Sequence, residues 1–347
     1  MPRDKLAEAM AHLDCQIGTK KGSVPRIGPP SQRSVGTAGS RKSPSVRTFF
    51  FESDLKFARA NRMIALSEKC IESRRTRGTS MTDWQANDYF HHSALQESMA
   101  QEQLSQLHLD GNESVLDVGC GDGKITAQIA GRVPHGSILG IDPSPAMITF
   151  ATRHFGTIAN PNLRFAVADV RHLTYKNQFD LVISFNALHW VPQQQEALRS
   201  IHAALKPNGK AQLRLVPEGS RKSLEDVIEQ VRSGPRWAPN FVGFEKPFAH
   251  FTPAEYRSMA EQAGFHVQKL NVADKAWDFT SRPSFEAFCR ATFAEWTQHL
   301  PESDWSAFIT EVLDRYQTIA AESSQENHTF KFYQMEVDLL RIQAELP

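Results

Sequence analysis

The chain has 347 residues, 40% of them hydrophobic, which is enough to bury the core of one large domain or two smaller ones. Its 39 basic and 39 acidic residues balance, and no apolar run approaches the roughly 20 residues that cross a bilayer, so no membrane-spanning segment is expected. The four cysteines are scattered without a CxxC pair, and the first residues lack the apolar core of a secretory signal. These features favour a reducing, cytoplasmic location and argue against a disulfide framework or a metal site.

The first 80 residues differ in composition from the rest of the chain. Residues 1–80 carry 16 Lys and Arg against 7 Asp and Glu, so the remainder has an equal excess of acidic residues. The stretch 16–48 is rich in Gly, Pro and Ser and has too few apolar side chains to offset the entropy of ordering it. We therefore predict a basic, largely disordered extension over 1–80 and a folded domain over 81–347.

Strands and helices are predicted to alternate along the folded part. Apolar spacing within 84–109 indicates a first helix. Strands follow at 114–119, 137–142, 163–169, 179–186 and 209–217, separated by helices at 124–133, 144–155 and 193–207. Ser144 has the residue type and position of an N-cap for the helix that follows it. This alternation is typical of an α/β fold with a doubly wound, mostly parallel sheet.

Acidic residues stand where three successive strands end. Asp117 directly precedes a loop of alternating glycines, Asp142 ends the second strand, and Asp169 follows the third. Ligands of a parallel sheet bind at the carboxyl ends of its strands, so the three acids are expected at one site. Asp142 lies 21 residues beyond Gly121, where an acid takes the two hydroxyls of a ribose. The pattern predicts a nucleoside ligand.

The glycine loop distinguishes between two kinds of nucleoside ligand. A dinucleotide site needs a G-x-G-x-x-G pattern, but Lys124 stands at the position of its third glycine. A buried carboxylate at Asp117 would also repel a diphosphate strongly. The same carboxylate suits a ligand that carries an ammonium and a sulfonium group. The residues therefore favour S-adenosylmethionine.

Four motifs follow one another in order: VLDVGCGDGKIT, GIDPSPAMI, VADV and FDLVISFNALHWV. With them, residues 84 to about 215 resemble the class I S-adenosylmethionine-dependent methyltransferases, and among these the trans-aconitate and juvenile-hormone-acid methyltransferases. Residues 252–272 and 328–341 resemble the late helix and the last two strands of that family. The resemblance implies a Rossmann-like sheet of seven strands, and residues 216–250 and 284–322 are expected to form a helical lid.

The resemblance also implies which residues bind the cofactor. A helix before the first strand is expected to lie across the cofactor and to place Tyr89 on the substrate side. The acid at Asp142 is expected to hold the ribose, and Asp169 to accept from the exocyclic amine of adenine. The expected cofactor residues are Gln96, Asp117, Gly119, Gly121, Asp142, Met147, Asp169, Val170 and Asn186.

The methyl acceptor is less defined by the sequence. A carboxylate is already ionised near pH 7 and needs no general base, whereas an amine, phenol or hydroxyl acceptor would need one. His189 is the candidate for such a base or, in the other interpretation, a polar wall beside the acceptor, and Trp190 is expected to wall the pocket. Arg214 and Arg236 are candidates to clamp a carboxylate.

Three functions are compatible with these patterns. The favoured one is a monomeric methyltransferase that acts on a small-molecule carboxylate or other oxygen. The second is a protein or RNA methyltransferase with the basic extension as a docking arm, although the acidic balance of the folded part disfavours nucleic acid. The third is a catalytically silent cofactor-binding subunit, against which the intact motifs argue.

Overall fold

A computed structural model describes residues 94–156, 160–323 and 325–342 of the chain. The predicted disordered extension over 1–80 lies outside these residues, and so do Tyr89 and the first part of the helix predicted over 84–109. Within the described ranges, no helix is both long and apolar enough to span a membrane.

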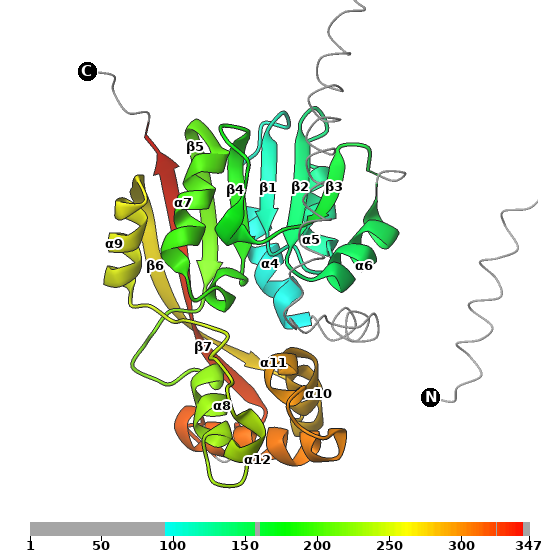
Figure 1. The fold of residues 1–347 in the computed structure, drawn as a ribbon, viewed down its shortest axis with the longest axis vertical. Helices are drawn as coiled ribbons and strands as arrows, with labels where there is room; N and C mark the ends of the chain where they lie inside the picture. The colour runs from blue at the N-terminus through cyan, green and yellow to red at the C-terminus, as the bar shows by residue number, and fades with distance from the viewer. Residues whose placement is uncertain (1–93, 157–159, 324, 343–347) are drawn as a thin grey trace, which may run out of the picture. The chain divides into compact units, whose positions relative to one another are not determined.

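Seven strands form one sheet in the order β3-β2-β1-β4-β5-β7-β6 (Figure 1). The first five strands pair in parallel, and β7 lies antiparallel between β5 and β6. This confirms the predicted mostly parallel sheet of a Rossmann-like fold. The strands are β1 (Ser114–Val118), β2 (Ser137–Asp142), β3 (Leu163–Val167), β4 (Phe179–Phe185), β5 (Leu205–Leu215), β6 (Phe265–Asp278) and β7 (Thr329–Arg341).

Helices alternate with these strands as predicted. Ser144 is the N-cap of the helix after β2, where its side chain accepts a 3.3 Å hydrogen bond from the backbone N–H of Met147. The helices are α4 (Ala94–Gln106), α5 (Lys124–Ala130), α6 (Pro145–Phe155), η1 (Val170–His172), η2 (Leu188–Trp190), α7 (Gln194–Ala204), α8 (Leu224–Arg232), η3 (Ala238–Phe241), α9 (Pro253–Gln262), α10 (Arg282–Thr292), α11 (Ala294–Thr297) and α12 (Glu302–Ala320).

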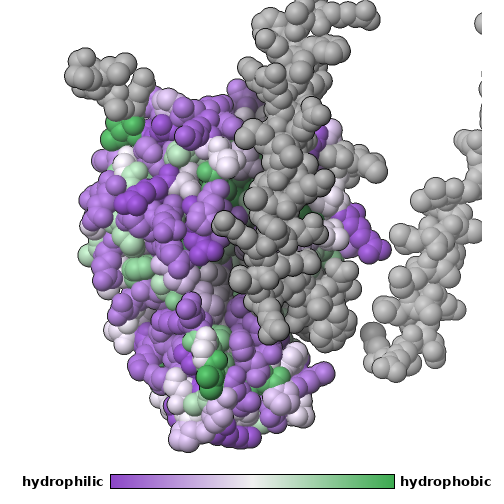
Figure 2. All heavy atoms as spheres, viewed as in Figure 1, coloured by the Kyte–Doolittle hydropathy of each residue, from purple (hydrophilic) through white to green (hydrophobic). Residues whose placement is uncertain are grey.

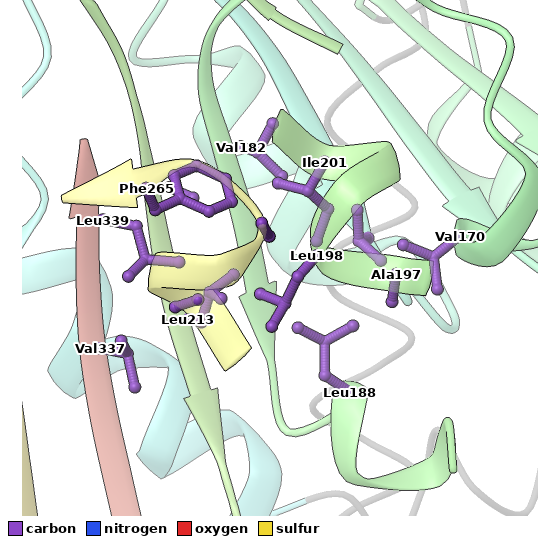
Figure 3. Close-up of a cluster of buried hydrophobic side chains, with 14 of the residues drawn as sticks. Val170, Val182, Leu188, Ala197, Leu198, Ile201, Leu213, Phe265, Val337 and Leu339 are labelled. Atoms are coloured by element: carbon purple, nitrogen blue, oxygen red, sulfur yellow. The ribbon is translucent and has the colours of Figure 1, made fainter. Parts of the chain in front are cut away.

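The two faces of the sheet are both buried, because alternate residues of a strand point to opposite sides. Leu116 and Val182 join a cluster with Ile201 of α7, which Figure 3 shows beside Val182. Val115, on the other face, joins a cluster with Ile129 of α5. Burying each such side chain stabilises the fold by about 1.5–3 kcal/mol. The central strands are therefore apolar on both faces, as parallel strands between two helix layers must be.

The strands β6 and β7 continue past the ends of the other strands into a separate group of helices (Figure 1). We call this group of helices the cap; it contains α8, η3, α10, α11 and α12. It has its own core, in which Phe285, Trp296, Phe308 and Tyr316 are buried. The helices predicted over 284–322 are part of it. The ends of β6 and β7 thus join the sheet and the cap without a linker.

A buried arginine connects helix α4 with the neighbouring strands β5 and β7. Arg214 of β5 is 0% exposed, and its guanidinium lies 2.8 Å from Glu336 of β7 and 3.3 Å from Glu102 of α4. It also donates a hydrogen bond to the carbonyl oxygen of Met99 in α4. Gln103 of α4 donates to Glu336 as well, over 2.8 Å. These contacts fix the helix that precedes β1.

Arg214→Ala is therefore expected to destabilise the protein. Removing its guanidinium leaves the Met99 carbonyl oxygen and one side of Glu336 without their donor, while Lys269 still pairs with Glu336 and Lys275 with Glu102. The expected cost is roughly 1–3 kcal/mol, or about 5 °C in melting temperature. Thermal unfolding followed by circular dichroism measures the shift.

The matched control is Arg236→Ala. The Arg236 side chain is 62% exposed and lies 3.5 Å from Glu311, and an exposed pair of this kind contributes about 0–1 kcal/mol. Equal melting temperatures for the two variants would contradict the structural role of Arg214.

Candidate functional site

The turn after β1 packs against the loop after β4 at the carboxyl ends of these two neighbouring strands. Gly119, Gly121 and Gly123 have φ values of 75°, 52° and 80°, a conformation that favours glycine. A Cβ atom added to Gly119 would lie 2.1 Å from the Cβ of Ala187, so the loop after β4 packs directly on this turn. Among the described residues, nothing lies within 4 Å of a Cβ added to Gly121. The backbone of Gly121 therefore faces open space.

Asp117 is a buried carboxylate behind this turn. It is 3% exposed, and its Oδ2 accepts a 2.6 Å hydrogen bond from Thr126 Oγ1 in α5. Burial raises the pKa of Asp117 to about 7; the Thr126 hydrogen bond opposes the rise, and the charge of Asp142 adds to it. A cation beside Asp117 would stabilise its ionised form. The site is thus suited to a positively charged group.

Asp142 approaches the same turn from the end of β2. Its Oδ2 accepts from the backbone N–H of Gly121 over 3.1 Å, and its Oδ1 accepts from that of Ser144 over 2.9 Å. Burial raises the pKa of Asp142, and these two N–H groups oppose the rise. The second strand-end acid therefore lies against the glycine turn of the first strand.

Asp169 is already bound to a neighbouring arginine. Its carboxylate caps η1 by accepting from the Arg171 backbone N–H over 2.9 Å, and it accepts three hydrogen bonds of 2.6–3.0 Å from the Arg171 guanidinium. Burial would raise the pKa of Asp169, but the Arg171 contacts outweigh it, so that pKa is lowered. The adjacent Val170 is buried in the core. An adenine amine at Asp169 would have to share the carboxylate with Arg171.

The loop after β4 holds two polar residues without full hydrogen bonding. Asn186 has a φ of 58°, and its buried Oδ1 has no hydrogen-bond partner in the described part of the chain. His189, in η2, is 4% exposed, and its Nδ1 also lacks a partner. Burial, and then the charge of His250, lower the pKa of His189 to about 3. His189 is therefore neutral near pH 7 and a weak base.

The remaining predicted residues lie in η2 after β4, in α6 and in α4. The ring of Trp190 stands edge-on to those of Phe248 and Trp296, with centroid distances of 6.3 Å and 5.8 Å. Trp190 thus joins the loop after β4 to the cap. Met147 is buried in the first turn of α6, and Gln96 belongs to α4.

Similarity to known proteins agrees with this geometry. Residues 115–209 match the family described as "Methyltransferase domain". The chain is 30% identical over 239 residues to "Putative methyltransferase 235L" of Invertebrate iridescent virus 6, which covers 69% of this chain and 87% of that protein. The chain belongs to the class I S-adenosylmethionine-dependent methyltransferases. S-Adenosylmethionine is the cofactor that defines this class.

Other relatives of this methyltransferase are known by name or by structure. It is 30% identical over 234 residues to the trans-aconitate 2-methyltransferase of Shigella flexneri serotype 5b, covering 66% of this chain and 87% of that enzyme. YcgJ protein from Bacillus subtilis shares the fold with a TM-score of 0.53 and 15% identity, over 72% of this chain and 100% of that one. Phosphoethanolamine N-methyltransferase 2 from Haemonchus contortus, solved with S-adenosyl-L-methionine, has a TM-score of 0.51 and 14% identity to this chain. The match covers 78% of this chain and 59% of that one.

The structure does not bring the two predicted acid-clamping arginines to the site. The guanidinium of Arg214 is used in the ion pairs that hold α4, and no part of its side chain is exposed. Arg236 lies 4.3 Å over the ring of Trp237 and pairs with Glu311 of α12 instead. Neither is retained as a clamp, because both have other partners. In the part of the chain that the structure describes, no group of three His, Cys, Asp or Glu side chains could hold a metal ion.

Three residues beside the site were not singled out from the sequence. Thr126 stands at the start of the helix after β1, and this position facing Asp117 could have indicated it. Arg171, two residues from Asp169, could also have been paired from the sequence. His250 had no such signal, because its neighbour His189 is distant in the chain and meets it only in the folded protein, with ring centroids 6.2 Å apart.

Asp117 is expected to make the cofactor-free protein less stable as the pH rises from about 4 to about 7. Its pKa in the folded state is about 7, against 3.8 in the unfolded state, so over this range the unfolded state releases a proton that the folded state keeps. Asp117→Asn mimics the protonated acid and removes this dependence. Relative to the wild type, the variant should gain roughly 2–3 kcal/mol between pH 5 and pH 7.

Urea unfolding of both proteins at the two pH values measures this gain. Titrations of groups distant from Asp117 are shared by the two proteins and cancel in the comparison, whereas the titration of Asp142 is coupled to that of Asp117. A free-energy difference that does not change with pH would show that Asp117 is ionised in the folded protein throughout.

Proposed function

We propose that this methyltransferase transfers its methyl group to a carboxylate oxygen of a small organic acid and so forms a methyl ester. The observation that carries the proposal is the weak basicity of His189, whose pKa is lowered to about 3 by burial and by His250. Such an imidazole takes a proton poorly from a phenol or an amine near pH 7. A carboxylic acid, whose pKa in water is roughly 4, is already ionised there. The relative named trans-aconitate 2-methyltransferase supports an acid as acceptor.

We further propose that the cofactor binds at the carboxyl ends of β1, β2 and β4. Gly121 offers open backbone, Asn186 offers an amide oxygen without a partner, and Asp117 is a buried acid that a cation would stabilise. Asp142, hydrogen-bonded to Gly121, is the proposed ribose ligand. These groups fit a nucleoside with ammonium and sulfonium charges. The other residues proposed to border the cofactor are Gln96, Gly119, Met147, Asp169 and Val170.

The bound cofactor supplies a methyl group made electrophilic by its sulfonium. The carboxylate oxygen provides the electron pair of the new O–C bond, the pair of the broken S–C bond stays on sulfur, and no proton has to be removed. Charge disappears from both oxygen and sulfur, so a site that excludes water favours the reaction. Trp190, packed on Phe248 and Trp296, is the proposed wall that excludes water and aligns the acid.

The domain limits and the monomeric state remain part of this proposal. Residues 81–347 would form the methyltransferase domain, with 216–250 and 284–322 over the acceptor. Hydrophilic residues cover most of the described surface visible in Figure 2. The large apolar side chains exposed among the described residues belong to separate segments, which supports a monomer. They are Val167, Val242, Val272 and Ile342.

Asp142→Ala is expected to weaken binding of S-adenosylhomocysteine by roughly 1.5–3 kcal/mol, the contribution of hydrogen bonds to a charged group. Isothermal titration calorimetry measures the change. Asp180→Ala is the matched control, because Asp180 also accepts from a backbone N–H, that of Ser114, but at the other end of β4. Equal affinity in a folded Asp142→Ala protein would contradict the assigned position of the ribose.

Turnover at saturating cofactor and saturating acid is expected to be nearly independent of pH between about 6 and 8, because the pKa of the acid and that of His189 both lie below this range. His189→Ala should slow it by about tenfold or less, through poorer positioning of the acid. Initial rates of label transfer to trans-aconitate and to a set of monocarboxylic acids give the profile. A steep rise with pH, together with near-total loss in His189→Ala, would indicate an acceptor that needs a base.

A further inference from the structure

Two buried imidazoles lie next to each other beside the loop after β4. His189 comes from η2, and His250 comes from the segment between η3 and α9. His189 is 4% exposed, and so is the side chain of His250. The backbone N–H of Ala249 donates a 2.9 Å hydrogen bond to the carbonyl oxygen of His189, which fixes the two segments side by side.

Both imidazoles contain nitrogen atoms that have no hydrogen-bond partner within residues 94–156, 160–323 and 325–342. These are Nδ1 of His189 and both Nδ1 and Nε2 of His250, all of them buried. Leaving a buried polar group unpaired costs about 1–3 kcal/mol, so each such group calls for a physical reason. Asn186, three residues before His189, has an unpaired Oδ1 as well. Unpaired polar atoms therefore gather at this loop, as expected where a polar molecule binds.

The carboxylate of Asp226 lies close to the imidazole ring of His250. Asp226 of α8 has its Oδ2 3.9 Å from His250 Nδ1, which leaves Nε2 as the nitrogen directed away from this charge. Lys246 lies 3.8 Å from the other oxygen of Asp226. Burial would raise the pKa of Asp226, but His250 and Ser223 outweigh it and hold that pKa at about 2. Asp226 is thus ionised near pH 7 and places a negative charge 3.9 Å from Nδ1 of His250.

We propose that His250 binds the acceptor, donating from Nε2 to a carboxylate oxygen, with Asp226 as the residue that positions and polarises its ring. This inference rests on the proposed function, because it assumes an acid as acceptor. His189 forms the other side of the same contact. The proposal gives the acid a binding partner that Arg214 and Arg236, which are paired elsewhere, do not provide.

An imidazole suits this reaction better than an arginine clamp. The carboxylate loses its charge as the O–C bond forms, so a strong, fully charged partner would stabilise the ground state more than the transition state. The imidazole of His250 offers a single N–H at Nε2, and the carboxylate of Asp226 lies 3.9 Å from its Nδ1. Such a donor can orient the acid while leaving its oxygen nucleophilic.

The contact also joins the two parts of the molecule around the acceptor. Asp226 belongs to the cap, and His189 belongs to the loop that packs on Gly119 through Ala187. An acid held between them would lie next to Trp190, whose ring is 5.4 Å from that of His189. The described residues thus lead without a break from the glycine turn to the proposed acid-binding ring.

The test uses the full chain with trans-aconitate and a set of monocarboxylic acids, and the acid with the highest kcat/KM serves as the probe. His250→Gln is expected to raise KM for the probe by about 10- to 100-fold with kcat nearly unchanged, because the contact is present in ground and transition states alike. Asp226→Asn should raise KM less and also preserve kcat. The Kd of the probe, measured by calorimetry in the presence of S-adenosylhomocysteine, should rise in parallel.

His299→Gln is the matched control, a histidine between α11 and α12 whose ring is tilted against Phe241 and edge-on to Phe244, with centroid distances of 5.6 Å and 5.1 Å. It should leave KM unchanged, and every variant should keep its affinity for S-adenosylhomocysteine. If acids are methylated but His250→Gln changes KM by less than twofold, the inference fails and the proposed function stands. If no acid is methylated, the proposed function fails and the inference with it.

A measurement on the wild type avoids the risk that His250→Gln does not fold. Histidine-labelled protein, saturated with S-adenosylhomocysteine, is titrated with the probe acid while its imidazole ¹⁵N resonances are followed. Shifts of two imidazoles that saturate with the Kd of the acid support the contact. Unchanged imidazole resonances at saturating acid would overturn it.

Discussion

At Gly119 the turn after β1 comes so close to the loop after β4 that an added Cβ would lie 2.1 Å from the Cβ of Ala187. This close approach joins the two halves of the site. On one side it places the strand-end acids, including Asp117, and on the other it places Asn186 and His189. Any side chain larger than hydrogen at this position would push the two loops apart. It would separate the residues proposed to bind the cofactor from those proposed to bind the methyl acceptor. The parallel pairing of β1 with β4 supplies the rigid base that this contact needs.

The acids of the site are held in surroundings that oppose their ionisation. Burial raises the pKa of both Asp117 and Asp142, so folding without a ligand places two groups under electrostatic stress. A cationic ligand relieves this stress when it binds. Stability and cofactor concentration are therefore coupled, since a ligand that binds only the folded state stabilises it. Local features that oppose stability are expected at functional sites for this reason.

The sequence predicted those parts of the structure that depend on near neighbours in the chain. The strand-end acids and the Ser144 cap follow from alternation and spacing, which are local. The partners of Arg214 could not be predicted, because Glu336 comes from β7 at the far end of the chain and turns the arginine inward. The same limit hid His250, whose neighbours come from the loop after β4 and from α8. Side-chain partners between distant segments are set by the packing of the whole fold.

Part of the cap is inserted in the hairpin that the two long strands β6 and β7 form. β6 and β7 pair from Phe265–Arg341 to Asp278–Thr329, and helices α10, α11 and α12 are all inserted at the end of this hairpin. His328 and Asp278, 2.7 Å apart, close the neck of the insertion. Segments added at the tip of a hairpin can be lengthened or exchanged without altering strand order. In evolutionary terms, the hairpin insertion, which contacts Trp190 through Trp296, can therefore diverge while the glycine turn and its acids are inherited unchanged.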